Sequence, residues 1–93
     1  MGAESKVEKH LRTEAKKHGY LCYKFTSPGN NGVPDRVLIG HGETLFIETK
    51  APGEEPRKLQ LKVHERMRKH GATVLVIDTK EKVDQFFCKK NPI

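Results

Sequence analysis

The chain has few of the features that mark secreted, membrane-spanning or disulfide-stabilised proteins. It contains two cysteines, Cys22 and Cys88, which lie far apart and outside any CxxC pattern. One disulfide is possible by count, but the N-terminal residues do not read as a signal peptide. We therefore expect reduced thiols and a cytoplasmic location, in the host cell if the protein is viral. No apolar run approaches the ~20 residues of a membrane-spanning helix, so we expect no membrane partner.

Motifs of several enzyme and cofactor classes are also missing. Five histidines are scattered along the chain: His10, His18, His41, His64 and His70. No two of them have the HxxxH spacing of a zinc site. Ser27 lacks the GxSxG surroundings of a serine hydrolase nucleophile, and the segment GNNG is not followed by the GK[ST] of a phosphate-binding Walker loop. We therefore expect neither zinc nor an organic cofactor.

Positive charge is what the chain has in excess. Its 93 residues include 18 Lys and Arg against 12 Asp and Glu, which gives a net charge of +6. This balance favours a polyanionic partner, with nucleic acid first, although solubility alone would also account for it. The length predicts one domain over residues 1–93, with a modest core that would gain from a partner subunit.

Hydrophobic periodicity predicts an α/β fold built from three helices and four strands. The expected elements are, in chain order, a helix at 4–18, strands at 20–26, 36–40 and 44–50, a helix at 57–70, a strand at 72–79 and a short helix at 80–88. The tight GHGE link makes the second and third strands an antiparallel hairpin, and the later strand–helix–strand passage predicts a parallel crossover. The result is a mixed sheet flanked by helices, followed by a loose KKNPI tail.

Apolar spacing predicts which side of each long helix is buried. On the first helix the buried side is expected to comprise Val7, Leu11 and Ala15. On the second helix the apolar side is expected to comprise Leu59, Val63 and Met67, with Leu61 beside them.

Two acidic residues edge the predicted hairpin. Asp35 opens its first strand and Glu48 lies at the end of its second, and these two strand ends are neighbours in an antiparallel pair. We therefore expect the two carboxylates to lie side by side. Lys50 faces the same side as Glu48, whereas Thr49 faces the opposite one. Each residue alone also reads as an ordinary turn or strand residue, but their convergence at one hairpin end favours a functional site.

Paired carboxylates of this kind predict a site for a hard divalent cation. Two such groups repel each other unless they are protonated or share a cation. Oxygen ligands without cysteine or paired histidines suit Mg²⁺ or Mn²⁺ better than zinc. A water bound to the cation becomes a better nucleophile, and the cation also holds a phosphate oxygen. With Lys50 to position that water or neutralise charge on the phosphorus, the group suits phosphodiester hydrolysis.

The segment from Pro34 to Lys50 resembles the signature of the PD-(D/E)XK nucleases. It contains PD at 34–35 and, thirteen residues after the aspartate, ETK at 48–50. The preceding GNNGVPD and the order of elements resemble the VRR-NUC family of that superfamily in particular. This family is known from stand-alone viral and bacterial proteins and from the nuclease domain of a DNA interstrand-crosslink repair enzyme. The resemblance spans nearly the whole chain and implies a restriction-endonuclease-like αβββαβ core with a short C-terminal helix.

The resemblance also implies an acidic residue on the first helix and a glutamine on the second. Glu8 matches the acid, with Glu4 one turn earlier as its rival, and Gln60 matches the glutamine. Without the resemblance, both would read as solvated helix residues. The family pattern further implies that the backbone carbonyl of Thr49 completes the metal shell. The expected catalytic residues are Glu8, Asp35, Glu48, Lys50 and Gln60, and the expected metal ligands are Asp35, Glu48 and Thr49.

DNA contacts are expected from the glycine-rich loop and from the basic second helix. Glycines would let a mobile GNNG loop, with Asn30 and Asn31, approach the DNA backbone closely. Lys24 on the preceding strand would meet a phosphate, and Lys58 and Lys62 would grip phosphates in a salt-dependent manner. A solvated helix face is an equally good reading of these lysines.

These observations predict a metal-dependent DNA endonuclease. A catalytic unit this small is expected to act as a homodimer that cuts both strands of branched DNA, and the family resemblance makes a four-way (Holliday) junction the expected substrate. Recombination, repair and phage DNA processing all fit such an activity. Two alternatives from other classes stay open at this point: a non-catalytic basic module that binds nucleic acid, and a subunit interaction protein.

Overall fold

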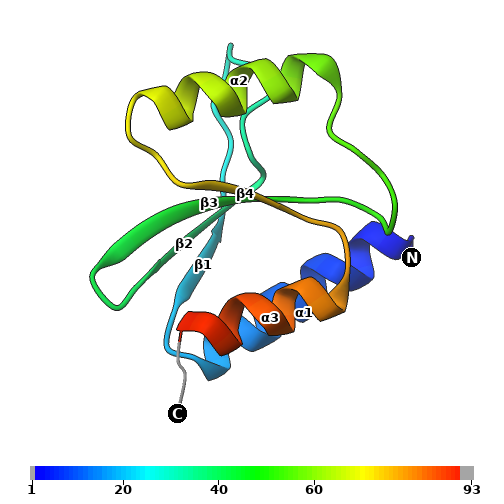
Figure 1. Ribbon diagram of the computed structural model, residues 1–93, viewed down its shortest axis with the longest axis vertical. Coiled ribbons are helices and arrows are strands. Elements are labelled where there is room, and N and C mark those ends of the chain that lie inside the picture. The colour runs from blue at the N-terminus through cyan, green and yellow to red at the C-terminus, as the bar shows by residue number, and fades with distance from the viewer. Residues whose placement is uncertain (1, 91–93) are drawn as a thin grey trace.

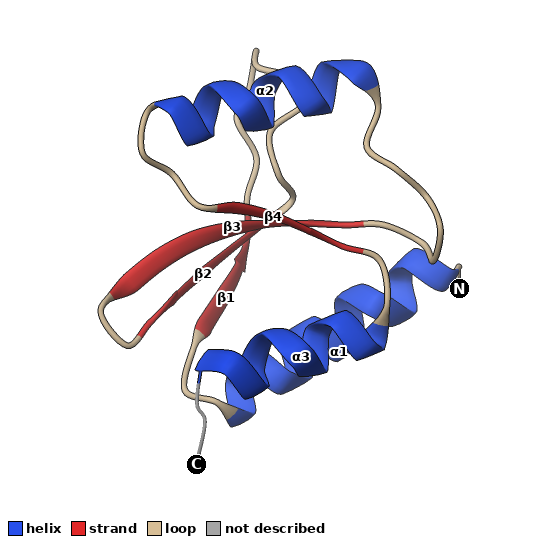
Figure 2. Cartoon of the chain, in the orientation of Figure 1, coloured by secondary structure: helices blue, strands red, loops and turns tan. Residues whose placement is uncertain are grey.

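A computed structural model of the chain describes residues 2–90 and arranges them in three layers (Figures 1 and 2). The elements are α1 (Ala3–Lys17), β1 (Leu21–Lys24), β2 (Arg36–Gly40), β3 (Glu43–Thr49), α2 (Lys58–Lys69), β4 (Val74–Ile77) and α3 (Lys80–Lys90). The sheet has the order β1-β2-β3-β4, antiparallel except for the parallel pair β3–β4. Helix α2 covers one face, while α1 and α3 lie together on the other. The predicted mixed α/β architecture, with the order αβββαβ and a C-terminal helix, is confirmed.

The end of the chain differs from the prediction in two ways. The last strand ends at Ile77 because the next two residues cap the start of α3. Asp78 pairs with Lys82 at 2.7 Å, and the Thr79 hydroxyl accepts a hydrogen bond from the Lys82 backbone N–H. Helix α3 continues to Lys90, so the first two residues of the expected loose tail are helical. The remaining three, residues 91–93, lie outside the described residues.

The hydrophobic core lies between the sheet and the α1–α3 layer. The predicted buried face of α1, with Val7, Leu11 and Ala15, is confirmed. This face packs in one cluster with the inward side chains of the sheet and of α3, among them Leu38, Leu45, Ile47, Val83 and Phe87. Removing these side chains from water supplies the main driving force that fixes α1 against the sheet. As a result, the N-terminal end of α1 has a defined position relative to the strand ends.

The predicted apolar side of α2 is wrong in part: Val63 and Met67 are half-buried, but the two leucines are not. Leu59 and Leu61 are 52% and 50% exposed, and the buried residues of this helix are Gln60 and His64. Gln60 donates a hydrogen bond to Glu48 on β3, and the His64 ring lies 3.9 Å from the same carboxylate, so the polar face of α2 lies against the sheet. Sequence periodicity weighs apolar residues alone and therefore misses a helix face that is buried for polar reasons.

The loop at residues 27–34 leads into the first acidic residue and packs against α2. Gly32 has a φ of +92°, and a Cβ at this position would lie 3.0 Å from a methyl group of Val63 and 3.2 Å from the carbonyl oxygen of Leu59. A side chain would be strained by its backbone conformation and crowded by the helix. The glycine thus lets the loop lie directly on α2 before the chain enters β2.

None of the helices within residues 2–90 combines the length and apolar content that crossing a lipid bilayer requires.

Candidate metal centre

The register of the hairpin brings three carboxylates together at one end of the sheet. Arg36 pairs with Ile47, so Asp35 and Glu48 are the next facing residues of the two strands. Glu4, at the start of α1, reaches the same point. One carboxylate oxygen from each acid, Glu4, Asp35 and Glu48, lies within 4.8 Å of the others. The side-by-side placement of the two hairpin acids is the one that antiparallel geometry predicts.

Asp35 is held in place by Thr49 on the neighbouring strand. The Thr49 backbone N–H donates to Oδ1 at 3.2 Å, and its hydroxyl donates to Oδ2 at 2.8 Å. Burial raises the pKa of Asp35, and the negative charge of Glu8 adds to this, while the two Thr49 hydrogen bonds oppose it. The net result is a fixed carboxylate that binds a proton more readily than an exposed aspartate does. The role of the Thr49 carbonyl as a metal ligand stays a prediction.

Glu48 is the most deeply buried of the three acids, with 4% of its surface exposed. The Nζ atom of Lys50 lies 3.6 Å from Oε2, which agrees with the prediction that both side chains face the same side. Burial raises the pKa of Glu48 to about 7, and the charge of Asp35 contributes in the same direction, while Lys50 lowers it. A buried carboxylate with a raised pKa is costly to ionise, and any cation that binds beside it stabilises the ionised form.

Gln60 orients Glu48 through a side-chain amide that is fixed at both ends. Its Oε1 accepts a hydrogen bond from the Arg57 backbone N–H at 2.8 Å, which satisfies a free backbone donor at the start of α2. Its Nε2 then donates to Oε2 of Glu48 at 3.2 Å. The start of α2 is therefore tied directly to the acidic cluster.

Comparisons with known proteins agree with this geometry. The structure matches a solved "VRR_NUC domain" with a TM-score of 0.86 and 29% sequence identity, and the match covers 100% of both chains. A curated protein, "Putative nuclease p44" of Acyrthosiphon pisum secondary endosymbiont phage 1, is 47% identical over 79 residues, which are 84% of this chain and 85% of that protein. The chain belongs to the VRR-NUC family. A scan against protein-family models gave no match.

In this VRR-NUC chain the first helix brings Glu4, and not Glu8, into the acidic cluster. The Oε1 atom of Glu8 accepts a hydrogen bond from Nη2 of Arg36 at 2.9 Å, in an ion pair that is mostly buried. Glu4 lies one turn nearer the N-terminus, and that end of α1 is the one beside the end of β3. Glu8 instead faces the start of β2, where it lies close to Asp35 without joining the cluster.

The predicted DNA-contacting residues of the VRR-NUC chain are exposed and lie on three elements. They are Lys24 on β1, Asn30 and Asn31 in the loop, and Lys58 and Lys62 on α2. The two asparagines line a hollow of about 550 Å³ between the loop and α2, together with Arg66. Gln60 borders a neighbouring hollow that Asn31 also lines. The two hollows share Asn31 and Leu59, and the second reaches Gln60, whose amide contacts Glu48 of the acidic cluster.

His64 lies beside the acidic cluster of this VRR-NUC chain, although the spacing between histidines did not single it out. It is fully buried, and its Nε2 lies 3.9 Å from Oε1 of Glu48. Burial lowers the pKa of His64, and the positive charges of Arg68 and Lys50 act in the same direction. The signal that was available is its spacing: it follows Gln60 by four residues, so the two side chains share one face of α2.

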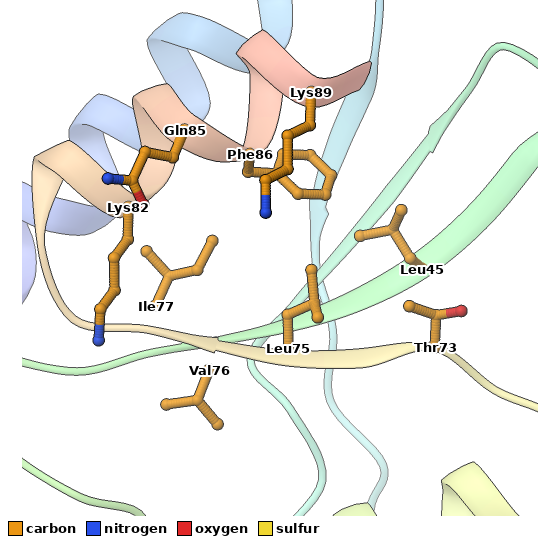
Figure 3. A pocket seen from close by; sticks show the side chains of 9 residues that line it. All are labelled: Leu45, Thr73, Leu75, Val76, Ile77, Lys82, Gln85, Phe86 and Lys89. Carbon is orange, nitrogen blue, oxygen red and sulfur yellow. The ribbon is translucent and has the colours of Figure 1, made fainter.

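A further hollow, of about 460 Å³, lies between α3 and β4 on the opposite face of the sheet (Figure 3). On the strand side, it is lined by Leu75 and Ile77, which point toward α3. On the helix side, it is lined by Lys82, Phe86 and Lys89. Its lining includes no acidic side chain. This apolar groove is therefore chemically unlike the acidic cluster, which remains the candidate catalytic centre of the VRR-NUC chain.

Proposed function

We propose that this chain is a metal-dependent DNA endonuclease that hydrolyses phosphodiester bonds with Mg²⁺ or Mn²⁺. The observation that carries the proposal is the convergence of the Glu4, Asp35 and Glu48 carboxylates within 4.8 Å, with the ammonium group of Lys50 beside them. Membership of the VRR-NUC family and the nuclease description of the phage relative support the reaction class.

The residues of the cluster fit a hard divalent cation. All of their side-chain donors are carboxylate oxygens, which Mg²⁺ and Mn²⁺ prefer. The pKa values of Asp35 and Glu48 are both raised, chiefly by burial, so a bound cation would relieve the cost of their charge. Asp35 and Glu48 would be the principal ligands, joined by Glu4 and the Thr49 carbonyl. When bound, the cation would make a bound water more acidic and hold a phosphate oxygen.

The chain's own side chains would orient the reactants around this site. Lys50 would hold the attacking water or stabilise the charge that develops on the phosphate, because its Nζ lies beside the ligand Glu48. Gln60 would keep Glu48 in one orientation through its doubly fixed amide. Glu8 would act indirectly, since its ion pair anchors Arg36 next to Asp35.

The DNA would lie across the surface formed by β1, the 27–34 loop and α2. Lys24, Lys58 and Lys62 would contact phosphates, and Asn30 and Asn31 would donate hydrogen bonds to the backbone. All five are exposed, so their side chains are available to a polyanion. The excess of positive charge in the chain supports the same partner.

We further propose a homodimer that acts on branched DNA such as a four-way junction, in recombination, repair or phage DNA processing in the cytoplasm. Exposed apolar residues support a partner subunit: Leu21 and Ile39 face each other across the β1–β2 pair, and Tyr23 lies two residues along the same strand. Covering such a patch is favourable in water. A monomeric mass at working concentrations would contradict the dimer. Each subunit would consist of one domain, residues 1–93.

Incubation with linear, flap and four-way junction DNA, in Mg²⁺, Mn²⁺ or chelator, tests the proposal. Cleavage that needs the cation and disappears in Asp35→Asn supports it. The variant should keep or improve its affinity for DNA, because a negative charge near the phosphate is removed. A protein that binds DNA but never cuts it would instead be the non-catalytic basic module, and one without salt-sensitive DNA binding would be a subunit interaction protein.

A further inference from the structure

The ring of His64 lies deep beside the candidate metal centre, at a position where packing alone would be served by an apolar side chain. It is 0% exposed, and it projects from the same face of α2 as Gln60, toward β3. Gln60 already donates to one oxygen of Glu48, Oε2. The other oxygen, Oε1, lies 3.9 Å from Nε2 of His64.

Three buried polar atoms of these two side chains have no partner among the described residues. Among the described residues, Oε1 of Glu48 and both ring nitrogens of His64 make no hydrogen bond. Buried polar groups are nearly always paired, because an unpaired one has lost its hydration without compensation. Hydrogen bonds of the N–H···O type are about 2.9 Å long, so the 3.9 Å between Nε2 and Oε1 exceeds such a bond by only about 1 Å.

We propose that His64 is a positioning residue for metal binding, whose Nε2–H donates to Oε1 of Glu48 and fixes the orientation of that carboxylate. Gln60 and His64, one helical turn apart, then hold both oxygens of Glu48 from the α2 side. The inference rests on the proposed role of Glu48 as a metal ligand. Hydrogen-bond partners of metal ligands orient them, and losing one lowers metal affinity by about 10- to 100-fold.

Three substitutions at this one position separate the hydrogen bond from packing. In His64→Gln the side-chain amide reaches the place of Nε2, whereas in His64→Asn the shorter amide reaches only the place of Nδ1. His64→Leu removes both ring nitrogens and keeps an apolar side chain of similar bulk. Mn²⁺ is titrated into each intact, metal-free protein by calorimetry, and thermal unfolding is recorded without metal. The control is Val83→Ala, a fully buried position in α3 on the other face of the sheet.

The Gln variant is expected to bind Mn²⁺ nearly as well as the wild type, and the Asn and Leu variants to bind it about tenfold more weakly or worse. Val83→Ala should lower the unfolding temperature and leave Mn²⁺ affinity unchanged. Wild-type affinity in the Asn variant, or equal losses in Gln and Asn, would overturn the role of His64. This comparison stands even if the Leu variant does not fold. A wild-type protein that binds no Mn²⁺ at all would overturn the proposed function itself.

Discussion

Raising the pH is expected to destabilise the metal-free protein, because Glu48 must then ionise in a buried site. The folded protein holds the pKa of this carboxyl at about 7, above the ordinary value of 4.5 that it regains on unfolding. Well below pH 4.5 Glu48 is protonated in both the folded and the unfolded state, so it does not lower the free energy of unfolding. As the pH rises from 4.5 to 7, the unfolded chain ionises first, so the free energy of unfolding falls.

The size of this effect follows from the shift in pKa. One pKa unit is worth about 1.4 kcal/mol, so a rise from 4.5 to about 7 amounts to roughly 3 kcal/mol when complete. That is a large share of the ~5–15 kcal/mol that stabilise a typical domain. Saturating Mn²⁺ should remove most of the loss, because it binds the ionised carboxylate in the folded state only.

Urea unfolding at a series of pH values between 4.5 and 8.5, with chelator present, measures this loss. The burial that lowers the pKa of His64 acts in the opposite direction, since a histidine kept neutral in the fold destabilises it as the pH falls. The contribution of Glu48 is therefore the difference between the wild type and Glu48→Gln, which has no carboxyl to ionise. An identical pH dependence of the free energy of unfolding in the two proteins would refute the reasoning. A wild type that gains stability relative to the variant as the pH rises would refute it too.

Two further predictions concern the acid on α1 and the basic surface. Glu4→Gln should weaken Mn²⁺ binding by about tenfold, measured by calorimetry. Glu8→Gln should weaken it less and mainly lower thermal stability, because it breaks the ion pair with Arg36. The opposite order would mean that α1 docks differently in solution. The double variant Lys58→Ala and Lys62→Ala should reduce the slope of log affinity for DNA against log salt by about 2, since each phosphate contact contributes about 0.9; an unchanged slope would place the DNA elsewhere.

The parts of the site that depend on local geometry could be predicted from the sequence. An antiparallel hairpin with a short link fixes its own register, so the proximity of Asp35 and Glu48 follows from chain spacing. The same is true of Lys50, which shares a face with Glu48 because strand side chains alternate. The resemblance to VRR-NUC proteins added Gln60, whose contact with Glu48 lies between elements that sequence spacing does not relate.

The parts that depend on how elements dock could not be predicted in this way. Whether Glu4 or Glu8 reaches the cluster depends on how far α1 extends past the end of the sheet, and this is set by core packing around residues such as Leu11. The buried side of α2 was missed for a related reason. Its buried face carries Gln60, which donates a hydrogen bond to a buried acid, and His64 beside that acid, and the apolar pattern does not record such a face.

The central claim is that the hairpin acids bind a hard divalent cation, and a crystal structure of the protein with Mn²⁺ tests it most directly. The account predicts an anomalous scattering peak between Asp35 and Glu48, at coordination distance from an oxygen of each and within reach of Glu4. Saturating Mn²⁺ with no peak at that position, or with the two carboxylates turned away from each other, would contradict it.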